Sequence, residues 1–278
     1  MINQDDICNS RTAVNGEGEI HEPPRLHTIS EYYNDAWEFL KNRWLNTALF
    51  SLVAMLCIST IISICYGIIY VLGIICTLIG GSAIAFYFNS IKDDESLLYP
   101  SIIAVGIIIA VIIFIIYLFF TLISILVIGP LNYGRCNGML ISKRKGNDAD
   151  VSNLFLAKDN YAKVAKVTAW HKLYVALWSL LFIIPGIIKH YSYALTYYIR
   201  YDNPELTGKE CIELSMEMME GHKMDLFLLH ITFVGLSFIG TFTCGLANFF
   251  LVPFMDTIMA QFYEDVKAKY EYFKGNMD

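Results

Sequence analysis

Apolar residues fill two long windows of the chain. No Lys, Arg, Asp or Glu occurs from Leu45 to Ile91, nor from Ser96 to Gly134. A helix that crosses a bilayer needs about 20 predominantly apolar residues. Leu45–Tyr66 and Ser101–Ile128 each satisfy this length without a charged side chain, so the pattern predicts one transmembrane helix in each window.

The rest of the first window, residues 67–91, has no single assignment. It is as uncharged as the residues before it, but Gly73 and the pair Gly80-Gly81 interrupt its apolar run. Glycine in a helix interior costs about 1 kcal/mol relative to alanine. The stretch is therefore a full span, a re-entrant piece or an extension of the first helix, and the pattern leaves these three open.

In the second half, the apolar run over about 164–201 is longer than one crossing. Pro185-Gly186 interrupts it, and proline removes a helical hydrogen bond. We expect two crossings, 164–184 and 187–201, with Pro185 and Gly186 as a candidate hinge between them.

Leu226–Met255 is again free of charged side chains and contains Gly245. Its length exceeds one crossing, so we expect it to be divided at this glycine. The predicted crossings are 224–246 and 247–266.

Two amphipathic segments lie outside the crossings. Residues 28–44 begin with Thr28 and Glu31, the spacing of a capping box. Their apolar residues recur at helical spacing, which is typical of an interfacial helix anchored by tryptophan. An extension of the first spanning helix is the alternative. The residues of this stripe are Tyr33, Trp37, Leu40 and Trp44.

The second amphipathic segment, residues 203–221, is acidic. Asn203-Pro204 is the pattern of a helix start, and Gly221 that of a helix end. Its carboxylates either recruit a basic protein partner or divalent cations, or form a solvated face. The polar residues 1–27 and 269–278 are predicted to be a disordered tail and a C-terminal tail.

The basic residues predict the orientation of the crossings. With the N-terminus in the cytoplasm, only Lys92 and Lys189 of the 20 lysines and arginines fall on the outer side. Cytoplasmic loops carry an excess of Lys and Arg. We therefore expect an all-α bundle of about six crossings over residues 45–268, with both termini cytoplasmic. The Lys143–Lys145 cluster is expected at the anionic headgroups.

Composition agrees with a polytopic membrane protein. Hydrophobic residues make up 56% and charged residues 17% of the chain, and the mean hydropathy is +0.49. A soluble domain has about 25% charged residues. The net charge of −6 argues against a nucleic-acid partner, and seven cysteines without a C-x-x-C pair argue against a disulfide module or metal cluster.

Several motifs of the second half resemble a family of bacterial multi-pass membrane proteins, the domain of unknown function 975. They cover about 160–265 closely, and 37–44 and 129–140 loosely, whereas 67–100 looks like an insertion. A more distant likeness is to the membrane domain of some glycerophosphodiester phosphodiesterases. The resemblance implies a six-helix membrane bundle and supplies no activity. The motifs are WSLLFIIPGIIK from Trp178 to Lys189, Tyr191-Ser-Tyr193, Asp202–Leu206, Ser215–Lys223, Leu226-Phe227, Thr243–Gly245, Pro253-Phe254 and Phe262-Tyr263.

Ionisable side chains at membrane depth are the candidate functional residues, because hydrocarbon makes them costly. His230 and Asp256 lie at similar depths in the last two predicted crossings. If they approach each other in an antiparallel hairpin, the pair is able to relay a proton or hold a cation. The alternative is that backbone carbonyls, water or hydroxyls satisfy each one separately. Arg135 either binds a lipid phosphate or reaches the cytoplasmic headgroups.

The chain contains none of the familiar catalytic, nucleotide-binding or metal-binding motifs. We therefore expect no catalytic residue, no cofactor and no metal. The leading hypothesis is a non-enzymatic accessory or scaffold protein of the bacterial cytoplasmic membrane, with the lipid bilayer and a protein at the acidic helix as partners. A carrier of a small ion or amphiphile is the alternative, and an enzyme acting on lipid headgroups is the weaker one. The pattern specifies no oligomeric state.

Overall fold

The computed structural model describes residues 13–14, 20–21, 23–91, 95–241 and 246–276. Contacts divide the chain into two compact units, Met1–Val53 with Pro130–Asp278, and Ala54–Gly129. Most of the predicted disordered tail, the predicted division at Gly245 and the last two residues of the predicted C-terminal tail fall outside the described residues.

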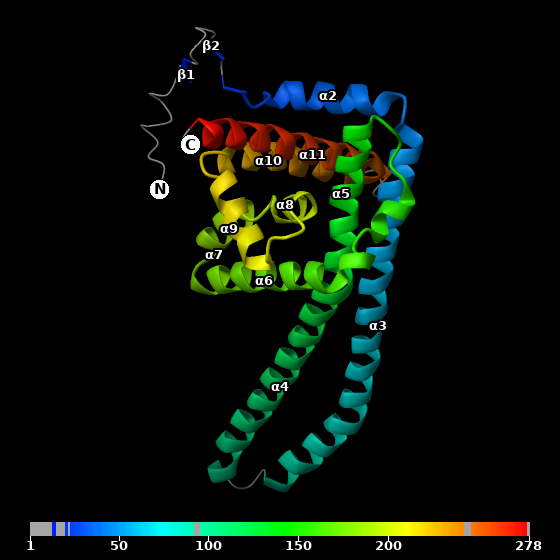
Figure 1. Cartoon of the computed structure of the whole chain (residues 1–278). Helices are drawn as coiled ribbons and strands as arrows, with labels where there is room; N and C mark the ends of the chain where they lie inside the picture. Colours follow the sequence, from blue (N-terminus) through cyan, green and yellow to red (C-terminus); the bar gives the residue numbers. More distant parts are fainter. Residues whose placement is uncertain (1–12, 15–19, 22, 92–94, 242–245, 277–278) are drawn as a thin grey trace. The chain divides into compact units, whose positions relative to one another are not determined.

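The Ala54–Gly129 unit consists of two long helices (Figure 1). The first is the greater part of α3, which runs without a break from Trp44 to Ile91. Residues 67–91 therefore extend the first helix. A Cβ at Gly73 or Gly81 would meet nothing within 4 Å, so these glycines mark no close contact.

The second long helix is α4, Glu95–Ile123, followed by the π-helical turn η1, Ser124–Ile128. The Tyr66 and Phe120 rings pack 5.2 Å apart. Thr60 donates to the carbonyl of Leu56. Such internal bonding satisfies a hydroxyl where water is absent.

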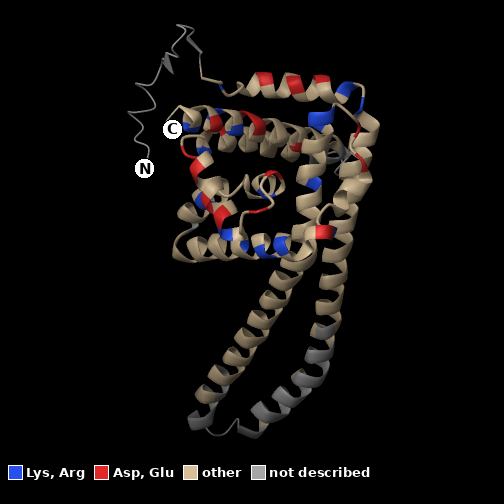
Figure 2. Cartoon of the chain, viewed as in Figure 1, with Lys and Arg blue, Asp and Glu red and all other residues tan. Residues whose placement is uncertain are grey.

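Two helical segments among the described residues are long and apolar enough to cross a membrane. They are Trp44–Val71 and Ile103–Lys145, with mean hydropathies of 2.4 and 3.2. Figure 2 shows that the described part of the Ala54–Gly129 unit is almost free of Lys, Arg, Asp and Glu.

The other unit is also helical, and the predicted all-α class is confirmed. A pair of two-residue antiparallel strands precedes its helices. The elements are β1 Ala13–Val14, β2 Ile20–His21, α2 Ile29–Lys41, the start of α3, α5 Gly129–Lys145, η2 Val151–Phe155, η3 Lys158–Asn160, α6 Tyr161–Leu181, α7 Ile183–Ser192, α8 Thr196–Asp202, α9 Gly208–Met218, α10 Lys223–Thr241 and α11 Leu246–Gly275.

The predicted capping box starts α2. The Thr28 side chain accepts from the Glu31 amide, and the Glu31 carboxylate accepts from the Thr28 amide. The helix ends at Asn42 and is separate from α3. It lies along α11 (Figure 1). Its buried face differs from the predicted stripe, because Trp37 is 58% exposed; the buried residues are Tyr32, Ala36 and Leu40.

The return from α6 differs from the predicted crossing 187–201. The helix breaks at Phe182, whose backbone is extended, and Pro185 lies in the first turn of α7. Proline is tolerated in a first turn because the N–H groups there have no partner in the helix. Two short helices, α7 and α8, replace one long one.

Two predicted helix boundaries are wrong. The acidic helix α9 starts at Gly208 instead of after Asn203, because Thr207 forms a capping box with Glu210. It ends at Met218, three residues before the predicted end at Gly221, and Gly221 has the positive φ of a turn. Most of the predicted C-terminal tail is helical, because α11 continues to Gly275.

Close packing of α5 depends on two glycines. A Cβ at Gly134 would lie 2.1 Å from the carbonyl oxygen of Leu154, and one at Gly138 would lie 2.7 Å from the Phe50 ring. At Gly134 the obstacle is backbone, which cannot rotate away.

We expect Gly134→Ala to lower the free energy of unfolding by about 1–3 kcal/mol, the usual cost of overpacking. Gly106→Ala is the matched control: it lies within α4, and its Cβ would meet nothing within 4 Å. Thermal unfolding of both variants in detergent measures the difference. Equal midpoints would contradict the close approach of α5 to Leu154.

Candidate functional site

Two of the three predicted candidate residues, Arg135 and Asp256, lie close together and form the candidate site. Arg135 lies on α5 and Asp256 on α11, one turn after Pro253. The Nε of Arg135 is 3.9 Å from Oδ2 of Asp256. Asp256 is only 7% exposed, so its carboxylate has little access to solvent.

The contact between them is electrostatic, without a hydrogen bond. The Arg135 Nε and the Asp256 Oδ2 are both buried, and neither has a hydrogen-bond partner among the described residues. At 3.9 Å they are beyond hydrogen-bond distance. Buried polar atoms are nearly always bonded, so this pair is an exception and a candidate for chemistry.

Groups from α5 and α8 surround the pair. Cys136 and Tyr198 interact electrostatically with Arg135 and Asp256. The Tyr198 ring stacks on that of Tyr263 at 5.0 Å. The site therefore has one cation, one carboxylate, one thiol and one phenol.

His230 does not take part in this site. Its Nδ1 bonds the Leu226 carbonyl at 3.0 Å, and its ring packs 5.5 Å from that of Tyr191. Among the residues that the structure describes, no hydrogen bond or ion pair joins it to Asp256. The predicted pairing of the two is replaced by Arg135 with Asp256, which depends on the register of α5 against α11.

Pro185 and Gly186 belong to a tight contact. A Cβ at Gly186 would lie 2.5 Å from the Ser179 Oγ and 2.9 Å from its Cα. The Pro-Gly pair therefore brings the backbones of α6 and α7 together. This packing does not favour the predicted hinge.

A second charged cluster surrounds Asp202, at the end of α8. Arg144 of α5 donates to both carboxylate oxygens at 2.7 and 2.8 Å. Lys267 and Tyr263 of α11 donate to Oδ2 at 2.6 and 2.8 Å. Arg144 also pairs with Glu264.

Burial by itself raises the pKa of Asp202, but the hydrogen bonds from Arg144, Lys267 and Tyr263 outweigh it and hold the pKa well below its usual range.

The Lys143–Lys145 cluster is predicted from the sequence to lie at the lipid headgroups. Only Lys145 is exposed and unpaired in the described structure, because Arg144 pairs with Asp202 and the Lys143 Nζ is buried.

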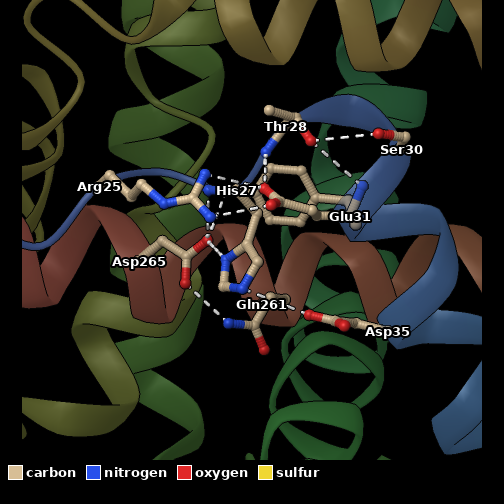
Figure 3. A network of polar contacts seen from close by, with 9 residues as sticks. Arg25, His27, Thr28, Ser30, Glu31, Asp35, Gln261 and Asp265 are labelled. Carbon is tan, nitrogen blue, oxygen red and sulfur yellow. Dashed lines mark hydrogen bonds and ion pairs between the residues drawn. The ribbon is translucent and has the colours of Figure 1, made fainter.

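A third cluster fastens α2 to α11 (Figure 3). Oδ2 of Asp265 lies 2.6 Å from the His27 Nδ1 and accepts from the Tyr32 hydroxyl at 2.6 Å. Gln261 donates to the other oxygen at 2.7 Å. The His27 Nε2 is 3.4 Å from Asp35, so the imidazole bridges two carboxylates.

Sequence reasoning missed Asp202, the last residue of α8, and Asp265, within α11, because both stand near other charged residues, where a solvated carboxylate is the ordinary expectation. One sequence feature pointed to Asp202: it is the first residue of the motif Asp202–Leu206, which contributes to the family resemblance. No group of three or more His, Cys, Asp or Glu in the described part of the chain is arranged to hold a metal ion.

The sequence model of a family described as a protein of unknown function (DUF975) matches residues 27–270. The match covers most of the chain, which therefore belongs to this family. No curated protein and no solved structure matches the chain.

Removal of one partner of the Arg135–Asp256 pair leaves a buried charge alone. We expect Asp256→Asn to lower the free energy of unfolding by about 3 kcal/mol, as for other broken buried pairs. Arg135→Gln/Asp256→Asn should regain part of this loss. Thermal unfolding in detergent gives the double-mutant cycle. Additive losses would contradict a direct interaction.

The Asp202 cluster predicts a pH-dependent stability. Because folding lowers the pKa of Asp202, its contribution is present above the unfolded pKa of about 3.9 and is lost as pH falls. At pH 7, Asp202→Asn should cost about 2 kcal/mol, typical of charged hydrogen bonds. The difference from the unaltered protein should shrink below about pH 4. Glu205→Gln, an exposed neighbour, is the control. A difference independent of pH would contradict the assignment.

Proposed function

We propose that this member of the family is a non-enzymatic integral protein of the bacterial cytoplasmic membrane that acts as an accessory or scaffold. Two apolar helical segments of spanning length support the membrane location. The six-crossing arrangement with cytoplasmic termini is part of the proposal and is supported by the distribution of basic residues.

The observation that carries the scaffold role is the pairing of Asp256 with Arg135. In a carrier, an intramembrane carboxylate faces the path of the ion. Here the nearest charge to Asp256 belongs to the same bundle, so the carboxylate serves to hold α5 against α11. Separating the two partners of a buried pair leaves an uncompensated charge, so the pair favours the arrangement in which α5 and α11 stay together.

The acidic helix α9 is the proposed docking face for a protein partner. Its buried side fixes it to the bundle through Cys211, Ile212, Ser215 and Met218. The carboxylates occupy exposed positions of the helix, and Figure 2 shows acidic residues along α9 in red. They are Glu210, Glu213 and Glu217, and Glu220 follows in the next turn. A rigid row of negative charge suits a partner with a basic surface.

One observation favours the carrier as a second candidate. The Arg135 Nε and the Asp256 Oδ2 are buried without hydrogen bonds, so a small ion or a proton that reached Asp256 would displace no hydrogen bond. The third hypothesis, an enzyme acting on lipid headgroups, is favoured by no contact among the described residues.

Transport measurements distinguish the two candidates. If the protein is a scaffold, we expect proteoliposomes of the purified protein to pass Na⁺, K⁺ and protons no faster than protein-free liposomes. Asp256→Asn should leave these fluxes unchanged. Flux above this background that Asp256→Asn abolishes, in a variant still folded by circular dichroism, would overturn the scaffold proposal in favour of the carrier.

Charge reversal tests the docking face. Glu213→Lys/Glu217→Lys should remove proteins that co-purify from cross-linked membranes, because the partner would meet like charge. Glu38→Lys/Glu205→Lys has the same charge change at exposed sites outside α9. Quantitative mass spectrometry of both preparations measures the effect. If the two variants retain or lose the same proteins, α9 is not the docking face.

A further inference from the structure

The turn between α6 and α7 exposes a continuous apolar surface. Leu180 is 85% exposed, Ile184 72% and Phe182 68%. No charged residue lies between Lys172 and Lys189. We call this end of the hairpin the apolar tip; its exposed residues are Leu180, Leu181, Phe182, Ile184, Ile187 and Ile188.

The chain after the apolar tip returns alongside α6. Contacts between the two arms follow one antiparallel register from the tip to the middle of α6. The facing pairs are Ser179 with Gly186, Trp178 with Lys189 at 5.0 Å, Tyr174 with Tyr193 at 6.2 Å, and Thr168 with Tyr197 at 3.2 Å.

The acidic helix α9 crosses this hairpin from α6 to the end of α7 (Figure 1). Its first residue, Gly208, packs against Val167 in the middle of α6. Seven residues later, the Ser215 hydroxyl donates to the Ser192 carbonyl at 2.9 Å. The next side chain, Met216, contacts the Lys189 ammonium at 3.6 Å. The exposed carboxylates of α9 therefore flank the hairpin from the level of Val167 to that of Lys189.

This placement limits how much of the hairpin lies in hydrocarbon. Ionised carboxylates exposed on α9 cannot face lipid chains, because a charge at the bilayer centre is costly. Only the apolar tip lies beyond them. From Trp178 to Phe182 the helix advances four residues, or about 6 Å. A bilayer core is about 30 Å thick, so the tip is too short to cross it.

We propose that the apolar tip inserts into one leaflet of the membrane and returns to the side it entered from. The depth agrees with interfacial segments, which bury their apolar face about 5–10 Å into the headgroup and acyl boundary. Trp178 and Lys189 then lie at the headgroups, where an indole and an ammonium are favourable. The inference rests on the membrane location in the proposed function, and it replaces two of the six proposed crossings, 164–184 and 187–201, by one insertion.

The insertion also improves the charge distribution. Two crossings at 164–184 and 187–201 place Lys189 on the outer side, whereas a single-leaflet insertion keeps it on the cytoplasmic side. Only Lys92 of the 20 basic residues then remains outside. Neither terminus changes side, because a pair of crossings and an insertion both return the chain to the side it came from.

Labelling from one side of the membrane tests the insertion. Lys189→Cys is treated with a membrane-impermeant maleimide in intact spheroplasts and in inverted vesicles, and labelled peptides are identified by mass spectrometry, which separates the native cysteines. We expect labelling only in inverted vesicles. Labelling in spheroplasts would overturn the proposal. His190→Cys repeats the measurement without removing the contact between Lys189 and Trp178.

Two controls separate this result from failure of the proposed function. Lys92→Cys should label in spheroplasts and Lys145→Cys in inverted vesicles. A chain absent from the membrane fraction, or an unlabelled Lys92→Cys in spheroplasts, would contradict the proposed membrane topology. If both controls behave as expected and Lys189→Cys labels from outside, only the single-leaflet insertion fails.

A depth measurement tests the contact with lipid directly. Phe182→Cys carrying a fluorescent label, reconstituted into vesicles, should be quenched more by lipids with a spin label near the headgroup than by lipids with one near the chain end. Stronger quenching by the deep label, no quenching, or cross-linking between copies through this position would each overturn the proposal.

Discussion

The hydrogen bonds to the Asp202 carboxylate fix how the helices of the larger unit pack against one another. This carboxylate receives hydrogen bonds from Arg144 on α5 and from Lys267 and Tyr263 on α11, so three helices meet at one anion. The next segment is fixed to the same point, because Arg200 of α8 donates to the carbonyls of Pro204 and Leu206 and α9 begins directly after them. Burial of a carboxylate is costly unless donors compensate it. Since the donors lie far away along the chain, this contact stabilises only one arrangement of the helices.

The two carboxylates that join α5 to α11 are satisfied very differently. Arg144 and Arg135 are nine residues apart on α5, or about 13 Å, so both contacts act on the same pair of helices. At Asp202 the donors leave little of the carboxylate unbonded, whereas at Asp256 the nearest nitrogen is 3.9 Å away and unbonded. A fully bonded network is rigid, and an incompletely bonded one leaves an atom available to a ligand or a proton. The Asp202 network therefore holds α5 and α11 in place through hydrogen bonds, and the Arg135–Asp256 pair adds an electrostatic contact between the same two helices.

The sequence patterns correctly predicted the structural features that depend on residues close together in the chain. The capping box at Thr28 and Glu31 and the helical class follow from spacing within a few residues, and both are confirmed. The partner of Asp256 could not be predicted, because it depends on the register of α5 against α11, which more than 100 residues separate along the chain. The same holds for His27 and Asp265. The predicted start of α9 is wrong because Asn203-Pro204 and Thr207 with Glu210 are competing start signals. The helix begins after the second signal, and Arg200 donates to the Pro204 carbonyl of the first.

Scarcity of charge makes each charged residue informative about the membrane. The long apolar helices of the Ala54–Gly129 unit could lie at many depths in a bilayer, because α4 has no charged side chain after Glu95. The α6–α7 hairpin is restricted in depth, since the glutamates of α9 are unfavourable in lipid on the side that they flank and the apolar tip is favourable in lipid at its end. Depth is thus set by the carboxylates that flank a segment as much as by its own hydrophobicity. An apolar run interrupted by Pro-Gly is therefore insufficient to identify a crossing, and its neighbours in the fold decide whether it spans the bilayer or enters one leaflet.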